Sequence, residues 1–150
     1  MARPNRIHSV AAWPNIASWD VVRRTDADEA AYRTALEYAD AAARLEPENS
    51  YILNTLGIAQ YRVGQYGESL KALTRSDEIY SKQPTGPEPG DIAFLAMAYH
   101  RLAHADQARQ LLDRLRQLLE QDRWKNDTDS LSFLREAEAL IEGDGAKPKE

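Results

Sequence analysis

His100 and His104 are the first residues whose types and spacing could do chemistry. Two histidines four residues apart on one helix can bind the same metal ion. Here, however, the pattern predicts a turn near Ala103, and the only acidic residue suggested as a third ligand is the more distant Asp106. We therefore expect polar surface or turn contacts for both histidines, and no metal site.

Other patterns that would indicate an active site are also incomplete. The stretch "PTGPEPGD" lacks the Lys-Ser/Thr pair of a nucleotide-binding loop. Serine, histidine and aspartate occur without a motif that would arrange them as a nucleophilic triad. The chain has no cysteine, and its carboxylates fall mostly at expected caps or exposed helical positions. We expect no catalytic residue and no cofactor, so the sequence predicts a protein that is not an enzyme.

Charge and hydropathy narrow the possible partners and the setting. The formal net charge of the 150 residues is -5, which argues against general binding to nucleic acid or to an anionic membrane. No apolar run approaches the roughly 20 residues that span a bilayer. The apolar stretch "VAAW" near the N-terminus is too short for the core of a signal peptide. With no cysteine to form disulfides, these features predict a cytoplasmic protein.

The elements that must position any binding residues are all helical. Alanine, leucine, glutamate, arginine and glutamine are abundant, and all favour helices. Caps, prolines and apolar spacing predict a helical domain over 13–142, between a flexible arm at 1–12 and a disordered tail at 143–150. The predicted helices span about 14–24, 28–45, 51–63, 66–81, 91–102, 105–121 and 128–141.

Two of the predicted hairpins are copies of one another. The segments "LGIAQYRVGQYGES" and "LAMAYHRLAHADQA" align without a gap at a separation of 39 residues. In the first copy Gly57 would face Ser69 across the hairpin, and in the second Ala96 would face Ala108. Small residues at these places let two antiparallel helices approach closely. Gly64 falls in the turn, where a positive φ favours glycine.

These motifs resemble the tetratricopeptide repeat, a helix–turn–helix unit of 34 residues. The central copy matches its Leu-Gly, aromatic, Gly-x-aromatic and small-residue positions, although Tyr61 comes one place late. The other copies depart from the pattern, since Ala103 replaces the turn glycine and Val22-Arg23 replaces the first Leu-Gly. The matching residues are Leu56, Gly57, Tyr61, Gly64, Tyr66, Ser69, Leu73 and Ser76, then Leu95, Ala96, Tyr99, Ala108 and Leu112, and Trp19, Ala35, Ala39, Ala42 and Pro47 of an earlier copy.

The resemblance implies a fold and a function. The expected fold is an all-α superhelix of about three helical hairpins, closed by a C-terminal capping helix. The segments "LNTLGIAQYRVGQY" and "AFLAMAYHRLAHADQAR" are also similar to the C-terminal repeats of large bacterial serine/threonine kinases or WD-repeat proteins. The expected function is a scaffold that binds a protein or peptide in the concave groove of the array.

The resemblance also implies which side chains line that groove. They belong to the first helix of the central hairpin and of the next one, and their tyrosine, methionine and arginine content suits protein binding. The alternative is that Ile58 and Met97 pack between helices and that the arginines are solvated. The predicted groove residues are Tyr51, Asn54, Ile58, Tyr61, Arg62, Met97, His100 and Arg101.

Two further possibilities stay open at this point. An incomplete first hairpin could leave apolar surface near Trp13 and Trp19, giving weak self-association or a structural cap of a larger signalling protein. An enzyme would instead need convergent polar groups in a closed pocket. The groove hypothesis predicts that Arg62→Glu combined with Arg101→Glu abolishes partner capture without changing helicity or melting.

Overall fold

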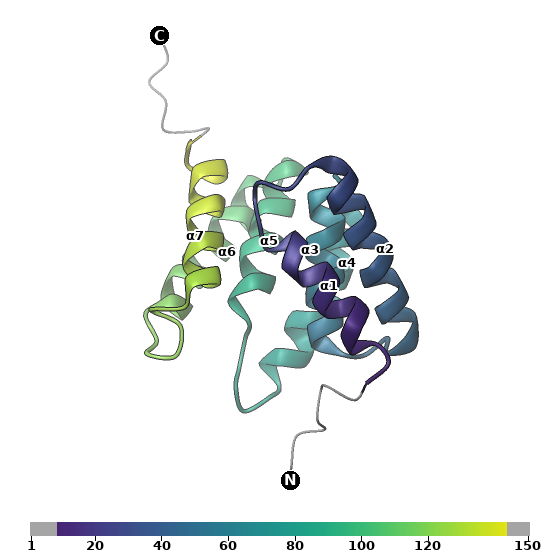
Figure 1. Cartoon of the computed structure of the whole chain (residues 1–150). Helices are drawn as coiled ribbons and strands as arrows, with labels where there is room; N and C mark the ends of the chain where they lie inside the picture. Colours follow the sequence, from purple (N-terminus) through teal and green to yellow (C-terminus); the bar gives the residue numbers. More distant parts are fainter. Residues whose placement is uncertain (1–8, 144–150) are drawn as a thin grey trace.

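The computed structural model describes residues 9–143, and these form seven α-helices and no strand (Figure 1). None of these helices is both long and apolar enough to cross a membrane. The helices are α1 (Ala12–Val22), α2 (Glu29–Leu45), α3 (Ser50–Arg62), α4 (Tyr66–Ser81), α5 (Pro89–Arg101), α6 (Ala105–Leu119) and α7 (Thr128–Ile141).

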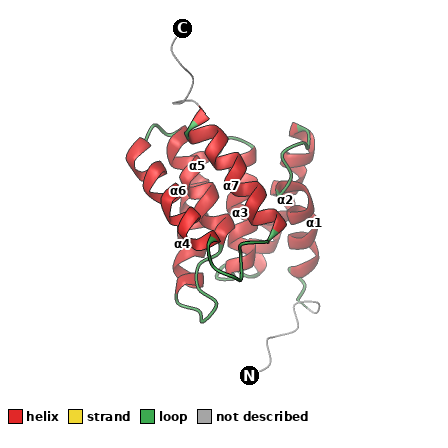
Figure 2. Ribbon diagram, turned by 90° about the vertical axis from the view of Figure 1, so that its left-hand side faces the viewer, coloured by secondary structure: helices red, strands yellow, loops and turns green. Residues whose placement is uncertain are grey.

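The helices pack as successive hairpins. The pairs α1/α2, α3/α4 and α5/α6 each form one hairpin, and α7 packs on α5 and α6. The odd-numbered helices also contact one another in order, from α1 through α3 and α5 to α7. Figure 2 shows α1 and α2 together at one edge of the molecule. The all-helical prediction is therefore confirmed for the described residues.

Three of the seven helix starts follow from side-chain capping signals. The side chains of Asp28, Asn49 and Asp127 accept hydrogen bonds from backbone N–H groups at the starts of α2, α3 and α7. The predicted bounds 66–81 and 128–141 are confirmed. Two starts differ from prediction by two residues, since α1 begins at Ala12 and α5 at Pro89, and those of α2 and α3 differ by one. Proline is tolerated in a first helical turn, because the N–H groups there have no partner within the helix.

The N-terminal boundary also differs in detail from the predicted flexible arm. Ala11 is buried against Ala42 and Ile52, and the Ser9 hydroxyl donates a hydrogen bond to the Glu46 carboxylate. Residues 9–12 are thus held against α2 and α3. The rest of the predicted arm, and the predicted tail beyond Gly143, lie outside the described residues.

Small residues allow the close helix contacts that the repeat predicts. Gly57 packs directly against α4, where an added Cβ would lie 2.4 Å from Leu73 Cγ. The Ser69 hydroxyl donates a 2.6 Å hydrogen bond to the Gly57 carbonyl. Ala96 and Ala108, which take the same places in the next hairpin, are both fully buried. The predicted pairing of Gly57 with Ser69 is confirmed, and the burial of Ala96 and Ala108 agrees with the same pairing in the next hairpin.

The two equivalent turns share a left-handed residue but not a glycine. Gly64 has φ of +83° and Ala103 has φ of +64°. A residue with a Cβ is strained in this region, by roughly 1 kcal/mol or more. We expect Ala103→Gly to raise the free energy of unfolding by about 1 kcal/mol, and Gly64→Ala to lower it by a similar amount. Denaturant titration of both variants checks this, and an unchanged or lower midpoint for Ala103→Gly would contradict it.

A cluster of polar groups lies inside the fold where α3, α4 and α5 meet. The Asp91 carboxylate is fully buried. It accepts a 2.7 Å hydrogen bond from the Asn54 amide, and its other oxygen lies 2.7 Å from the Ser76 hydroxyl. Ser76 Oγ is also 3.0 Å from the carbonyl oxygen of Ser50. This cluster joins three helices through side chains that are distant in sequence.

Candidate protein-interaction surfaces

The predicted groove residues lie on α3 and α5, but most of them are buried. Ile58 and Met97 have no exposed surface, and Asn54 and Tyr61 are also buried. The Arg62 side chain is only 8% exposed. Five of the eight predicted residues are therefore part of the interior, and for Ile58 and Met97 this is the alternative that the sequence left open. Ile58 and Met97 have no surface to offer a partner, and the other three have little.

The side chains of α1 and α7 fill the space that an open groove would need. Trp19 of α1 packs edge-to-face on Phe133 of α7, with ring centroids 6.0 Å apart. Phe133 packs in the same way on Phe94 of α5, at 5.1 Å. A further link between the two ends is the 3.3 Å ion pair of Arg23 with Asp129. The first and last helices thus meet through side chains across α3 and α5.

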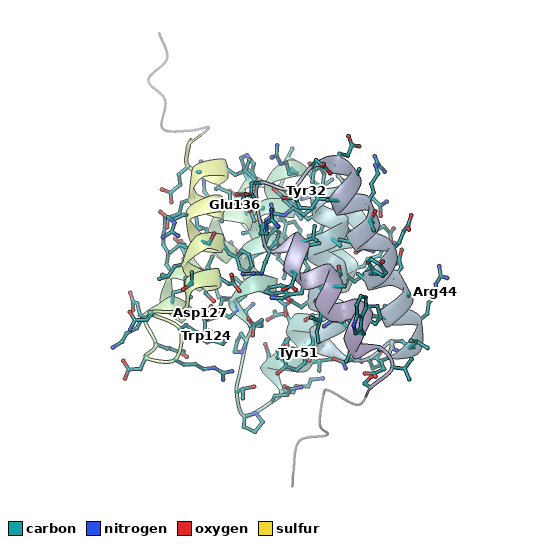
Figure 3. All side chains as sticks on the ribbon, in the orientation of Figure 1. Tyr32, Arg44, Tyr51, Trp124, Asp127 and Glu136 are labelled. Carbon is teal, nitrogen blue, oxygen red and sulfur yellow. The ribbon has the colours of Figure 1, made fainter. Side chains whose placement is uncertain are left out.

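Arg62 also joins the first and last helices. Its Nε donates a 2.9 Å hydrogen bond to the carbonyl of Val22 at the end of α1. Its Nη1 donates to both carboxylate oxygens of Glu136 on α7, at 2.5 and 3.1 Å. The guanidinium also lies over the rings of Phe94 and Tyr32. Figure 3 labels Glu136 and Tyr32, two of the residues that Arg62 contacts. Arg62 is a structural residue here.

The three remaining predicted residues do not form one surface. Tyr51 is exposed at the start of α3, where its ring packs on Tyr80. His100 is half-buried and Arg101 is exposed, both at the C-terminal end of α5. The start and the end of a helix of this length are roughly 15 Å apart, because each residue adds about 1.5 Å. Tyr51 therefore lies at the opposite end of the helices from His100 and Arg101. Whether these side chains bind a partner stays a prediction.

Neither histidine of the predicted turn joins a metal-binding cluster. Among residues 9–143, no group of three or more histidine, cysteine or acidic side chains is placed to hold a metal ion. His104 is the residue before α6, and its ring packs on Tyr99 at 5.9 Å. That is the turn contact expected from the sequence.

A different face, on α1 and α2, carries most of the exposed large apolar side chains. Of the seven such side chains among the described residues, four lie on these two helices, and a fifth, Val10, lies two residues before α1. Trp13 is 70% exposed and Ile16 is 56% exposed, although tryptophan and isoleucine are usually buried. We call this surface the outer face; its exposed large side chains are Val10, Trp13, Ile16, Tyr38 and Leu45.

Helix α2 has two stripes of largely apolar residues, one that packs inward and one that lies on the outer face. The members of the outward stripe recur at alternating spacings of three and four residues, which place them on one side of the helix. They are Ala31, Thr34, Tyr38, Ala41 and Leu45, and each is exposed or half-exposed. The stripe that packs inward consists of Tyr32, Ala35, Ala39 and Ala42. The outward spacing is visible in the sequence, but the repeat motif draws attention only to the inward one.

An open groove runs between the two helices of this face. It has a volume of about 330 Å³ and a mostly apolar lining. Ala17 and Val21 of α1 form one wall, and the other wall includes Thr34 and Tyr38 of α2. The Trp13 ring lies against Tyr38 with centroids 6.3 Å apart. The predicted apolar surface near Trp13 is therefore present, whereas Trp19 packs inward.

Comparisons with known proteins add no relative. No model of a known protein family matches the chain, and no curated protein matches it.

Proposed function

We propose that this chain is a non-catalytic protein-interaction module, built as a tetratricopeptide-like superhelix, that binds a protein partner through its outer face. The observation that carries the proposal is the concentration of exposed Trp13, Ile16 and Tyr38 on one pair of helices. Exposed apolar patches of this kind, with aromatic side chains, are typical of protein interfaces. The ordered contacts of α1, α3, α5 and α7 support the superhelical arrangement.

The outer face suits this role better than the concave face. On the concave side, Trp19 packs on Phe133 and Arg62 is bonded to Glu136. A peptide in the groove would have to displace these contacts. On the outer face, Trp13 and Tyr38 can bury their rings without any rearrangement of the core. Rigid surfaces of this kind bind without the cost of reorganisation.

A second candidate is a structural cap within a larger helical assembly. The two ends of the hairpin array differ, and this difference supports the idea. At the α7 end the exposed residues of the last helix and its C-cap are Thr128, Arg135, Ala139 and Glu142, and none of the exposed large apolar side chains lies there. At the α1/α2 end the outer face exposes large apolar side chains, as it would where another hairpin packs.

The test compares partner capture by wild type with capture by Tyr38→Glu. A charge at residue 38 would have to be buried in the contact, so we expect the variant to lose at least about ten-fold in captured partner. Gln110→Glu is the matched control, because it adds the same charge at an exposed position on α6. All three proteins should give the same helical spectrum and melting midpoint. Equal capture by Tyr38→Glu and wild type would contradict the proposal.

A further inference from the structure

The stripe on α2 is complementary to itself when one copy is reversed. Along the exposed half of the helix the order is Thr34, Tyr38, Ala41, Leu45. Against an antiparallel copy, Tyr38 falls opposite Ala41 and Leu45 falls opposite Thr34. Each layer then pairs a large side chain with a small one, which is how facing helices fill space without clashes.

Charges beside the stripe follow the same two-fold pattern. Glu37 and Arg44 are exposed and lie seven residues apart, so they flank the stripe on the same side. Neither makes an ion pair with another residue between 9 and 143. Figure 3 shows Arg44 pointing away from the body of the molecule. The register that sets Tyr38 against Ala41 also sets Glu37 close to Arg44 of the other copy. The two-fold axis repeats this contact, so a pair of copies has two of them.

We propose that the partner of the outer face is a second copy of this chain, bound through an antiparallel α2–α2 contact about a two-fold axis. This inference rests on the proposed function and names its partner. Such a contact is isologous, so it closes after two copies. Trp13 and Ile16, next to the stripe, extend the apolar area that the second copy covers.

Other ways of pairing two copies fit less well. A parallel contact would set Tyr38 against Tyr38, which crowds the centre, and would place Glu37 and Arg44 of the two copies on opposite sides of the interface, where they cannot pair. A head-to-tail contact would place the outer face on α7, whose exposed side chains include the charged Arg135 and Glu142. Only the antiparallel register matches both size and charge.

The test measures mass in solution by light scattering and sedimentation over a wide concentration range at low salt. Wild type should shift with concentration from 16.9 kDa towards twice that mass. Glu37→Arg alone, or Arg44→Glu alone, places like charges together at both symmetric contacts. Each single variant should weaken pairing by about ten-fold, and the effect should shrink at high salt.

Charge restoration is the decisive comparison. The double variant Glu37→Arg/Arg44→Glu should pair as wild type does, because both attractive contacts return in reversed form. An equal mixture of the two single variants should pair better than either one alone, since the arginine introduced in one chain then meets the glutamate introduced in the other. A wild type that stays at one-chain mass, or pairing unaffected by these swaps, would overturn the inference.

The same variants separate this inference from the proposed function. If wild type is monomeric but Tyr38→Glu still loses capture of a different protein, the second copy is ruled out and the interaction role stands. If Tyr38→Glu changes neither mass nor capture, the outer face has neither role and both proposals fail.

Discussion

Arg62→Glu is expected to destabilise the protein by about 3–5 kcal/mol. The substitution removes the hydrogen bond to Val22 and sets a carboxylate against Glu136 in a largely buried site. It also removes the cation from the face of Phe94. Whole domains are stable by only about 5–15 kcal/mol, so this loss is a large fraction of the total. Denaturant titration by circular dichroism measures the change.

Arg101→Glu is the matched control for that variant. Arg101 is exposed at the end of α5, where it donates a long 3.4 Å hydrogen bond to the Tyr61 hydroxyl. Its reversal should cost less than about 1 kcal/mol. Contrary to the sequence-based expectation, the double variant should melt below wild type, because Arg62 is buried. A midpoint for Arg62→Glu equal to that of Arg101→Glu would contradict the structural role.

Asp91→Asn is expected to stabilise the protein increasingly as the pH rises. Burial raises the pKa of Asp91 well above its usual value, although the hydrogen bonds from Asn54 and Ser76 lower it in part. Ser76 has one hydroxyl hydrogen but lies near two acceptors, Asp91 and the Ser50 carbonyl. A proton on Asp91 resolves this conflict, since the acid can then donate to Ser76. Asparagine can reproduce that pattern through its amide N–H.

The direction of this pH dependence follows from which state of the protein binds the Asp91 proton more tightly. The folded state binds the Asp91 proton more tightly than the unfolded chain, whose aspartates titrate near pH ~4. The stabilising contribution is thus complete below that pH and is lost as the pH rises through the folded-state pKa. Over that window the wild type should lose up to about 1.4 kcal/mol per pH unit relative to Asp91→Asn.

Paired denaturant titrations across this pH range make the comparison. The two proteins should have similar stability at acid pH, and the asparagine variant should be the more stable at neutral pH. A difference in unfolding free energy that does not vary with pH would show that folding does not raise the pKa of Asp91, and would contradict the prediction.

Sequence alone predicted the parts of the fold that depend on near neighbours. Helix ends follow from caps such as Asp127 and from prolines, and hairpin pairing follows from small residues such as Gly57 and Ser69. These signals act between residues that are close in the chain. The exposed Trp13 was likewise suggested by the incomplete first hairpin.

The burial of the predicted groove could not be inferred in this way. It depends on contacts such as Arg23 with Asp129, which are 106 residues apart and follow no repeat. The burial of Asp91 has the same origin, because Asn54 lies 37 residues away on another helix. From one sequence, an aspartate that caps a helix cannot be distinguished from one that is buried, such as Asp91. The outward stripe of α2 is different, since its spacing is legible in the sequence without any long-range contact.

The bridge between α1 and α7 changes how the array can come apart. An open array of hairpins holds each unit only to its neighbours, so its ends can fray while the middle stays folded. Here Trp19 packs on Phe133 and Arg62 reaches both Val22 and Glu136, so neither end can leave without breaking contacts with the other. The two ends of the array are therefore coupled, and we expect them to unfold together as one cooperative unit.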